Sequence, residues 1–488
     1  MSKKINGIFF ILIFILVSFK SYSQGLKSYE FANSFYPGEK EKLSFWIDNF
    51  LKEAEVSQIH QIYGIISPHA GYIYSGKIAA YSYKVLKNER FDVVVLLGPS
   101  HRYYFEGVAV YPSGEFETPL GNLEVDKEII QEFNSLEFFK ANPKYFYGEH
   151  SLEVQLPFLI KVLGKVKIVP LIFGKVEYFQ MKEVARKLKE ISLKKKILLV
   201  VSTDLSHYHP YRQANRIDKE TIKFIKDKDA YSLWVSSQLK EARACGIYPL
   251  ITFLIYAQMK NAQIEILKYA NSGDTFGRKT QVVGYLSAVA YAKENKEEEM
   301  REFALNEEEK ITLLKIARKT LESFLKEGKI PQFGAVSENL KEKRGAFVTL
   351  KKNGLLRGCI GRIVADTALY KLISQVVIDS ALNDPRFSPV GYEELKDIEI
   401  EISVLTPFTE IENLEEIEVG KHGLMIRKGF YSGLLLPQVP LEYGWGRETF
   451  LKHICLKAGL PPDAYKEKDV LLYKFSAIVF SEKDYGLK

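Results

Sequence analysis

Cysteine is scarce in this chain, with three residues among 488. An odd number of cysteines excludes a fully paired disulfide framework. A bridge between Cys359 and Cys455 is open in an oxidising compartment, and it would leave Cys245 unpaired. A leftover thiol is the place to look for reactivity or for metal binding.

A concentrated charge of one sign is also missing. The chain has 68 basic and 61 acidic side chains, and no stripe of Lys and Arg is interleaved with aromatic residues. Proteins that bind nucleic acid usually carry a concentrated basic footprint. We therefore predict that nucleic acid is not a partner.

An apolar run near the N-terminus, residues 8–19, follows a basic start and ends at Lys20. The run is short for a membrane span, and Ser21 and Ser23 supply the small residues of a signal-peptidase site. We predict an export signal over residues 1–23. The mature protein would then be periplasmic or secreted, with no membrane span, and an uncleaved N-terminal anchor is the alternative.

The length of the chain favours two or three domains, and a hydrophobic fraction of 46% supplies material for their cores. Residues 24–293 alternate short apolar runs, at Val93 and Leu198, with helix-like stretches over 40–53 and 178–190. This alternation predicts an α/β domain with a largely parallel sheet. The charged stretch that follows predicts a linker over residues 294–305.

Residues 306–488 follow a different pattern. The segment 398–404 alternates apolar and polar side chains, as a strand with one wet face does. The second domain is therefore predicted to be α+β, with an antiparallel or mixed sheet. Its expected helices are 306–325, 369–382 and 448–458, and its expected strands include 346–350, 398–404 and 433–436.

Three strand-like apolar runs in the first domain are each followed closely by a histidine. The histidines are His69, His101 and His207. Runs that are apolar on both faces suit parallel strands, and open α/β sheets bind ligands beyond the carboxyl ends of such strands. The three imidazoles are therefore expected at one edge of one sheet.

This edge has the residues for a metal site. His69 and His101 form a candidate ligand pair, and Cys245, at an expected loop-to-helix junction that would stabilise a thiolate, is the best third ligand. Asp204 and His207 are expected to act as a proton-transfer pair, in which the carboxylate orients the imidazole.

His150 has two open interpretations. It is either a catalytic residue or part of an ordinary helix start, with Ser151 as the N-cap and Glu153 in the first turn.

Five motifs in the first domain resemble the Memo family, also called AmmeMemoRadiSam system protein B. The resemblance covers about residues 26–292, and the family is similar in fold to the class III extradiol dioxygenases, which hold Fe(II) with two His and a carboxylate. It implies that His69, His101 and Cys245 stand at the ligand positions, with Asp204 and His207 in the same pocket. A thiolate in place of the carboxylate argues against ring cleavage and suits iron or copper. The motifs are Pro68–Tyr72, Gly98–His101, Glu149–Glu153, Ser202–His207 and Ala244–Ile247.

The second domain carries the sequence Leu356-Arg-Gly-Cys-Ile-Gly361, which reads either as a reactive motif around Cys359 or as a turn with two glycines of positive φ. The segment resembles the AMMECR type, or AmmeMemoRadiSam system protein A, as do residues 383–389 and 455–462. The motif residues are Arg357, Gly358, Cys359, Gly361 and Arg386, of which the arginines are candidates for binding an anion. Members of both families tend to occur with a radical-SAM protein, so a functional link to one is expected.

The sequence thus predicts a fusion of two domains with a mononuclear iron or copper site for redox or oxygen chemistry on a small substrate. Two alternatives stay open. One is a metal-independent hydrolase or transferase with Cys245 as nucleophile and His69 or His207 as base. The other is a binding module without catalysis.

Overall fold

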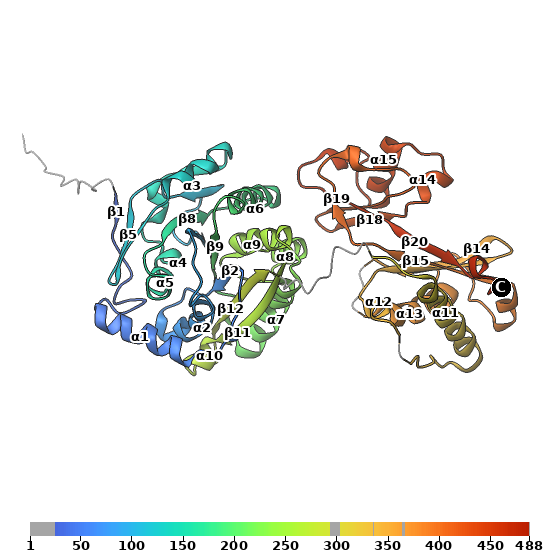
Figure 1. The fold of residues 1–488 in the computed structure, drawn as a ribbon, viewed down its shortest axis with the longest axis horizontal. Coiled ribbons are helices and arrows are strands. Elements are labelled where there is room, and N and C mark those ends of the chain that lie inside the picture. The colour runs from blue at the N-terminus through green and yellow to red at the C-terminus, as the bar shows by residue number, and fades with distance from the viewer. Residues whose placement is uncertain (1–24, 293–302, 335, 364–366, 488) are drawn as a thin grey trace, which may run out of the picture. The chain divides into compact units, whose positions relative to one another are not determined.

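The computed structural model describes residues 25–292, 303–334, 336–363 and 367–487. The chain divides into two compact units, residues 1–294 and 295–488 (Figure 1). The predicted export signal and the charged stretch 294–302 lie outside the described residues. Among the helices that are described, none has both the length and the apolar character needed to cross a membrane.

The first unit is built on a nine-stranded sheet in the order β10-β12-β2-β9-β3-β8-β4-β7, with β11 also paired to β12. The neighbours β2, β9, β3 and β8 run parallel. Every residue of β3 and β9 is buried, which is why these segments are continuously apolar in sequence. The strands are β2 (Ile62–Ser67), β3 (Val93–Pro99), β4 (Val108–Val110), β7 (Phe139–Ala141), β8 (Lys167–Phe173), β9 (Ile197–Ser202), β10 (His207–His209), β11 (Ala262–Asn271) and β12 (Val282–Ala292).

Helices cover both faces of this sheet (Figure 1). Helices α1 (Lys40–Glu53), α2 (Tyr72–Lys84) and α5 (Leu156–Leu163) pack together on one face. The other face carries α6 (Tyr178–Ser192), α7 (Tyr211–Asp227), α8 (Ala230–Gln238) and α9 (Ile247–Met259). The α/β prediction is confirmed, and so is the helix over 40–53. Shorter elements are α3 (Lys127–Glu132), α4 (His150–Glu153), α10 (Ser272–Thr275), β1 (Leu26–Lys27), β5 (Glu115–Thr118) and β6 (Gly121–Glu124).

The second unit holds two antiparallel sheets, in the orders β14-β13-β15-β20 and β16-β19-β17-β18. Helices α11 (Glu307–Glu327) and α13 (Leu369–Leu382) contribute to one core, and α15 (Arg447–Lys457) contributes to the other. This architecture confirms the α+β prediction. The strands are β13 (Ala346–Lys352), β14 (Leu355–Arg362), β15 (Ile398–Leu405), β16 (Thr409–Glu410), β17 (Gly423–Lys428), β18 (Tyr431–Leu435), β19 (Leu471–Phe475) and β20 (Ala477–Ser481).

The Leu356–Gly361 motif is part of strand β14, so the interpretation as a turn is wrong. Gly358 and Gly361 are required for space, since neither has a positive φ. A Cβ on Gly358 would lie 2.1 Å from the carbonyl oxygen of Ser380, and one on Gly361 would lie 2.3 Å from the Phe347 ring. These glycines therefore let α13 and β13 approach β14 closely.

All three cysteines are free thiols. Cys455 is buried in the core around α15, whereas Cys359 is on strand β14 of the other sheet. The bridge between them that the sequence left open is therefore not formed.

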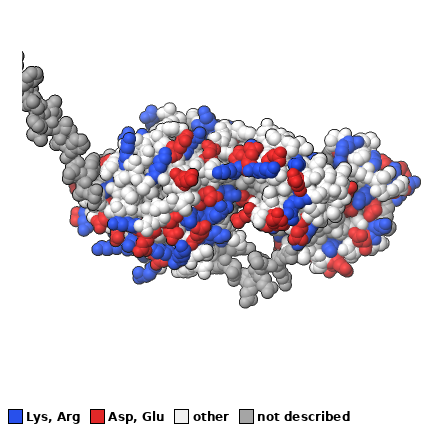
Figure 2. Space-filling model, turned by 90° about the horizontal axis from the view of Figure 1, so that it is seen from above, with Lys and Arg blue, Asp and Glu red and all other residues white. Residues whose placement is uncertain are grey.

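The visible surface mixes the two signs of charge. Figure 2 shows basic and acidic side chains interspersed over the face that it displays. The absence of a nucleic-acid partner stays a prediction.

Candidate metal centre

The parallel strands bring the candidate ligands to one edge of the sheet. His69, His101 and Asp204 each lie two residues beyond the carboxyl end of their strand, β2, β3 and β9 respectively. The potential ligand atoms of His69, His101 and Cys245 all lie within 4.8 Å of one another. His69 is buried and Cys245 is half-buried, whereas the His101 side chain is 29% exposed, so the site opens toward His101.

Two glycines allow the surrounding segments to approach this edge. A Cβ on Gly98 would lie 2.6 Å from Leu152 of α4. A Cβ on Gly246 would lie 2.8 Å from the carbonyl oxygen of Ser202. Any larger residue would push α4 or the Cys245 loop away from the strand ends.

Hydrogen bonds fix the tautomer of His69. Ser202 Oγ donates its one proton to the carbonyl oxygen of Ser151 at 2.6 Å and accepts a bond from the Gln155 amide at 2.9 Å. The same Gln155 amide nitrogen donates to the carbonyl oxygen of Pro68, which fixes its orientation. Ser202 Oγ therefore accepts from Nδ1 of His69 at 2.9 Å, so Nδ1 carries the proton.

His69 consequently presents the lone pair of Nε2 toward Cys245 Sγ, 3.1 Å away. Burial and the neighbouring His101 lower the pKa of His69 well below its ordinary value. The ring is therefore neutral, as a metal-ligating imidazole must be.

Glu149 orients His101 in a similar way. Its carboxylate accepts bonds from Nδ1 of His101 at 2.9 Å, from the His101 backbone N–H, and from the Ser151 N–H. Burial raises the pKa of Glu149, but the bonds from His101 and Ser151 outweigh this effect and hold the pKa at about 2. The Nε2 atom of His101 is left for a ligand.

A second potential ligand group is formed by His101, Glu149 and His150. Its carboxylate already accepts the three N–H bonds just described, which gives Glu149 the role of supporting His101. The His150 ring stacks on His101, with 4.5 Å between centroids, and contacts Phe35 at 4.6 Å. Burial and the neighbouring histidines lower the pKa of His150 to about 3.

The start of the helix at His150 differs from the expectation. The N-cap is Glu149, whose side chain accepts from the Ser151 N–H, and Ser151 is buried inside the helix. Glu153 reaches back to the N-terminal segment, where it accepts from the backbone N–H groups of Glu30 and Phe31. The N-cap predicted from the sequence, Ser151, therefore lies two residues after the observed one, Glu149.

Cys245 is held at the end of β9 by its surroundings. Its Sγ accepts a hydrogen bond from the Asp204 N–H at 3.1 Å. Burial and the Asp204 carboxylate raise the pKa of the Cys245 thiol well above its ordinary value. Burial and the like charge of Asp204 therefore outweigh the backbone donors at this junction, and the expected thiolate stays a prediction.

Asp204 does not orient His207 as expected. Its carboxylate accepts from the backbone N–H of His69 at 2.9 Å and lies 4.0 Å from Nε2 of the same residue. The Nδ1 atom of His207 lies 2.9 Å from the carbonyl oxygen of Leu205, so this carbonyl fixes the tautomer. His207 lines an open cleft together with Cys245, next to the candidate ligands.

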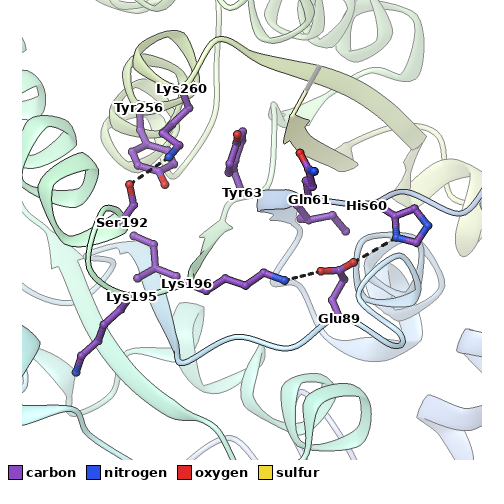
Figure 3. Close-up of a pocket in the computed structure, with 11 residues that line it drawn as sticks. His60, Gln61, Tyr63, Glu89, Ser192, Lys195, Lys196, Tyr256 and Lys260 are labelled. Carbon is purple, nitrogen blue, oxygen red and sulfur yellow. Dashed lines mark hydrogen bonds and ion pairs between the residues drawn. The ribbon is translucent and has the colours of Figure 1, made fainter. Parts of the chain in front are cut away.

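Another cavity, of about 450 Å³, lies at the opposite, amino ends of β2 and β9 (Figure 3). Glu89 there pairs with Lys196 at 2.9 Å and lies 3.6 Å from His60. Lys260 lies over the Tyr63 ring, 4.9 Å from its centroid. No cysteine and no second histidine are among the residues that line this cavity. The candidate site is therefore the group of His69, His101 and Cys245 at the carboxyl ends of the strands.

The two arginines of the second-domain motif are occupied. Arg357 pairs with Glu394 at 3.0 Å, and Arg386 pairs with Asp384 at 2.7 Å. Asp384 also accepts from the backbone N–H of Cys359. These pairs tie neighbouring segments to β14, which gives both arginines a structural role. Anion binding by the two arginines stays a prediction.

Comparison with known proteins identifies both parts of the chain. Residues 27–289 match the family model described as Memo-like protein, and residues 314–480 match AMMECR1. The chain belongs to the Memo-like protein family. The resemblance seen in the sequence is thereby confirmed, and the Memo-like domain is followed by an AMMECR1 domain.

Some relatives match about half of this chain, and others match about a third of it. A MEMO1 family protein of Sulfurisphaera tokodaii is 36% identical over 276 residues, which are 52% of this chain and 96% of that protein. A Pyrococcus abyssi protein is 46% identical over 182 residues, which are 35% of this chain and 89% of that protein. The crystal structure of an uncharacterised Pyrococcus horikoshii protein is 44% identical, covers 35% of this chain and 90% of its own, and gives a TM-score of 0.34.

The supporting residues of the site were not assigned from the sequence. Ser202 is the last residue of β9 and directly precedes Thr203 and Asp204. Its position at the end of a strand was a signal in the sequence that could have assigned Ser202 to the site. Gln155 had none, because it reaches His69 through Ser202 from a different segment. Glu149 is the first residue of one of the motifs, but nothing in the sequence alone links it to His101, which it holds.

Proposed function

We propose that the Memo-like domain binds one metal ion, iron or copper, through His69, His101 and Cys245 and uses it for redox or oxygen chemistry on a small substrate. The observation that carries the proposal is the closeness of the three ligand atoms, all within 4.8 Å of one another. Both imidazoles have their Nδ1 atoms engaged with Ser202 and Glu149, so both present Nε2. This is the arrangement that metal-ligating histidines adopt.

The charges of the pocket also fit a cation. Burial raises the pKa values of both the Cys245 thiol and the Asp204 carboxyl, while the His69 ring is neutral. A divalent ion would supply the positive charge that a buried thiolate and carboxylate need. Two imidazoles and a thiolate are ligands that iron and copper accept, and either metal supplies electron transfer or oxygen activation when bound.

His207 is suited to proton transfer in this proposal. Because its Nδ1 donates to the Leu205 carbonyl oxygen, its Nε2 is free to accept a proton. The residue lines the same cleft as Cys245. A substrate in the cleft would therefore meet a base on the wall that also carries the thiolate ligand.

The proposal is tested by metal analysis of the purified full chain. We expect about one equivalent of iron or copper, which His101→Ala should reduce strongly. The control is His60→Ala, which changes an exposed histidine at the opposite cavity and should keep the metal. Equal metal content in the two variants would contradict the ligand assignment, and zinc as the sole metal would contradict the redox chemistry.

A metal-independent hydrolase or transferase is the second candidate, because Cys245 Sγ lies 3.1 Å from the His69 ring, as in a nucleophile and base pair. The raised pKa of Cys245 and the lowered pKa of His69 favour the neutral pair and oppose thiolate formation. This candidate predicts rapid alkylation of Cys245 by iodoacetamide in chelator-treated protein. The metal proposal predicts slow alkylation there.

Export and the link to a radical-SAM protein stay predictions.

A further inference from the structure

The cleft beside the candidate metal centre is lined by two basic residues together with apolar and polar ones. It has a volume of about 490 Å³, within the range of small-molecule sites. Lys240 and Arg243 supply its charge, and its described lining contains no carboxylate. Its other lining residues are Leu205, His207, Ser237, Gln238, Ala242, Ala244, Cys245, Ile247 and Tyr248.

Lys240 and Arg243 have no anionic partner within the described part of the chain. Neither forms an ion pair with an Asp or Glu side chain there. Arg243 Nε donates a hydrogen bond to the backbone carbonyl oxygen of Lys240, which carries no negative charge. Both also border a neighbouring cleft that Glu220 and Glu241 line, yet they make no ion pair with these carboxylates. Their charges are available to a ligand.

The loop that carries these cations is fixed to the fold. The Arg243 N–H donates to Thr221 Oγ1 of α7, and the Gly246 N–H donates to Thr203 Oγ1 beyond β9. Cys245 lies between these two anchors. Arg243 is therefore close to Cys245 along the chain, and hydrogen bonds hold the loop that contains both residues. A loop that is already ordered lowers the entropy cost of binding a ligand there.

We infer that this cleft binds the substrate of the proposed metal centre, and that the substrate is a small organic anion. Its carboxylate or phosphate group would lie at Lys240 and Arg243. Its apolar part would extend along Leu205 and Tyr248 toward Cys245 and His207. The inference rests on the proposed function for the role of the ligand as substrate, whereas the anion site itself is independent of the metal.

The test is calorimetric titration of metal-free full-length protein with benzoate and with phenyl phosphate, which separate the two anion classes. We expect saturable binding of one or both, and a loss of affinity of about tenfold or more in Lys240→Gln/Arg243→Gln, because each cation donates charge-assisted hydrogen bonds. The control is Lys219→Gln/Lys223→Gln, which removes the same charge from exposed lysines of α7 outside the cleft lining. This control should bind like the unaltered protein.

A conservative variant guards against misfolding, since Lys240→Arg/Arg243→Lys keeps both charges and should retain binding within about threefold. Three results would overturn the inference: no binding of either anion by the unaltered protein, equal affinity in the charge-removing variant, or equal binding of neutral benzyl alcohol. Because the titration uses metal-free protein, each of these results leaves the metal proposal standing. Loss of metal in His101→Ala is judged separately.

Discussion

Nδ1 of His69 lies 2.9 Å from Oγ of Ser202, and the protons around that hydroxyl leave it no role except that of acceptor. A chain of hydrogen bonds from the Pro68 carbonyl through Gln155 to Ser202 therefore decides that Nδ1 of His69 carries the proton and that Nε2, which faces Cys245, does not. The tautomer of a candidate ligand is built into the core before any metal arrives.

Replacing Ser202 with alanine should weaken metal binding. The variant removes the acceptor of His69 Nδ1 and leaves the Ser151 carbonyl oxygen without its donor. We expect metal affinity to fall about 10- to 100-fold and stability to fall by about 1–3 kcal/mol. Competition with a chelator measures the first effect, and urea unfolding of the chelated protein measures the second.

Ser82→Ala is the matched control for this variant. Ser82 is also fully buried, and its Oγ donates to the carbonyl oxygen of Ile66 on β2, a bond that involves none of the candidate ligands. Its loss should lower stability while metal affinity stays within about twofold. A parallel fall in affinity for both serine variants would mean that general loosening, and not the tautomer of His69, governs the site.

Glu149→Gln should also weaken the metal site, by about tenfold or more. The carboxylate now accepts three hydrogen bonds from N–H groups of His101 and Ser151. The amide of the variant would point its own N–H group at one or more of these donors, and that hydrogen bond would be lost. Glu153→Gln is the control, because this buried acid sits one turn further along α4 and holds Glu30 and Phe31 instead. Chelator competition on both variants gives the comparison. Similar affinities in the two would remove Glu149 from the site.

The strands and the main helices could be predicted because their signals are local. Continuous apolar runs marked β3 and β9, and 3.6-residue spacing marked α1 and α13. The motif around Gly358 was ambiguous, because its glycines serve contacts with Ser380 and Phe347 that lie far along the chain. A glycine required for space and one required for a turn look alike in sequence.

The grouping of His69, His101 and Cys245 could be expected from topology and from the family resemblance. The partners of these residues could not. Asp204 turned toward the backbone of His69, and His207 took the carbonyl of Leu205, because hydrogen bonds at a strand end depend on rotations of a few bonds. The burial that raises the pKa of Cys245 could not be predicted either, since burial is a property of the whole fold.

The AMMECR1 domain should lose stability in acid through Glu394. Arg357 and Lys352 hold the pKa of Glu394 at about 2, compared with its ordinary value of 4.5. A lowered carboxyl pKa gives stability that is complete above pH 4.5 and is lost as the pH falls toward 2. Glu394→Gln should therefore be less stable at pH 7, by up to about 1 kcal/mol, and should equal the unaltered protein near pH 2.

This prediction can be followed with Trp445, which is the only tryptophan of the second unit. In a Trp46→Phe/Trp234→Phe background, its fluorescence reports urea unfolding of that unit at a series of pH values. A constant gap between Glu394→Gln and its parent from pH 7 to pH 2 would refute the assignment of the pH dependence to Glu394.

Gly358→Ala should destabilise the AMMECR1 domain by about 1–3 kcal/mol or prevent its folding. The added Cβ would lie 2.1 Å from the Ser380 carbonyl oxygen, so α13 would have to move away from β14. Gly391→Ala is the control, because Gly391 has φ of −85° and no atom within 4 Å of the position of its Cβ. Urea unfolding of both variants decides the matter. Equal stability of the two would show that α13 yields readily and that the close approach at Gly358 does not constrain the fold.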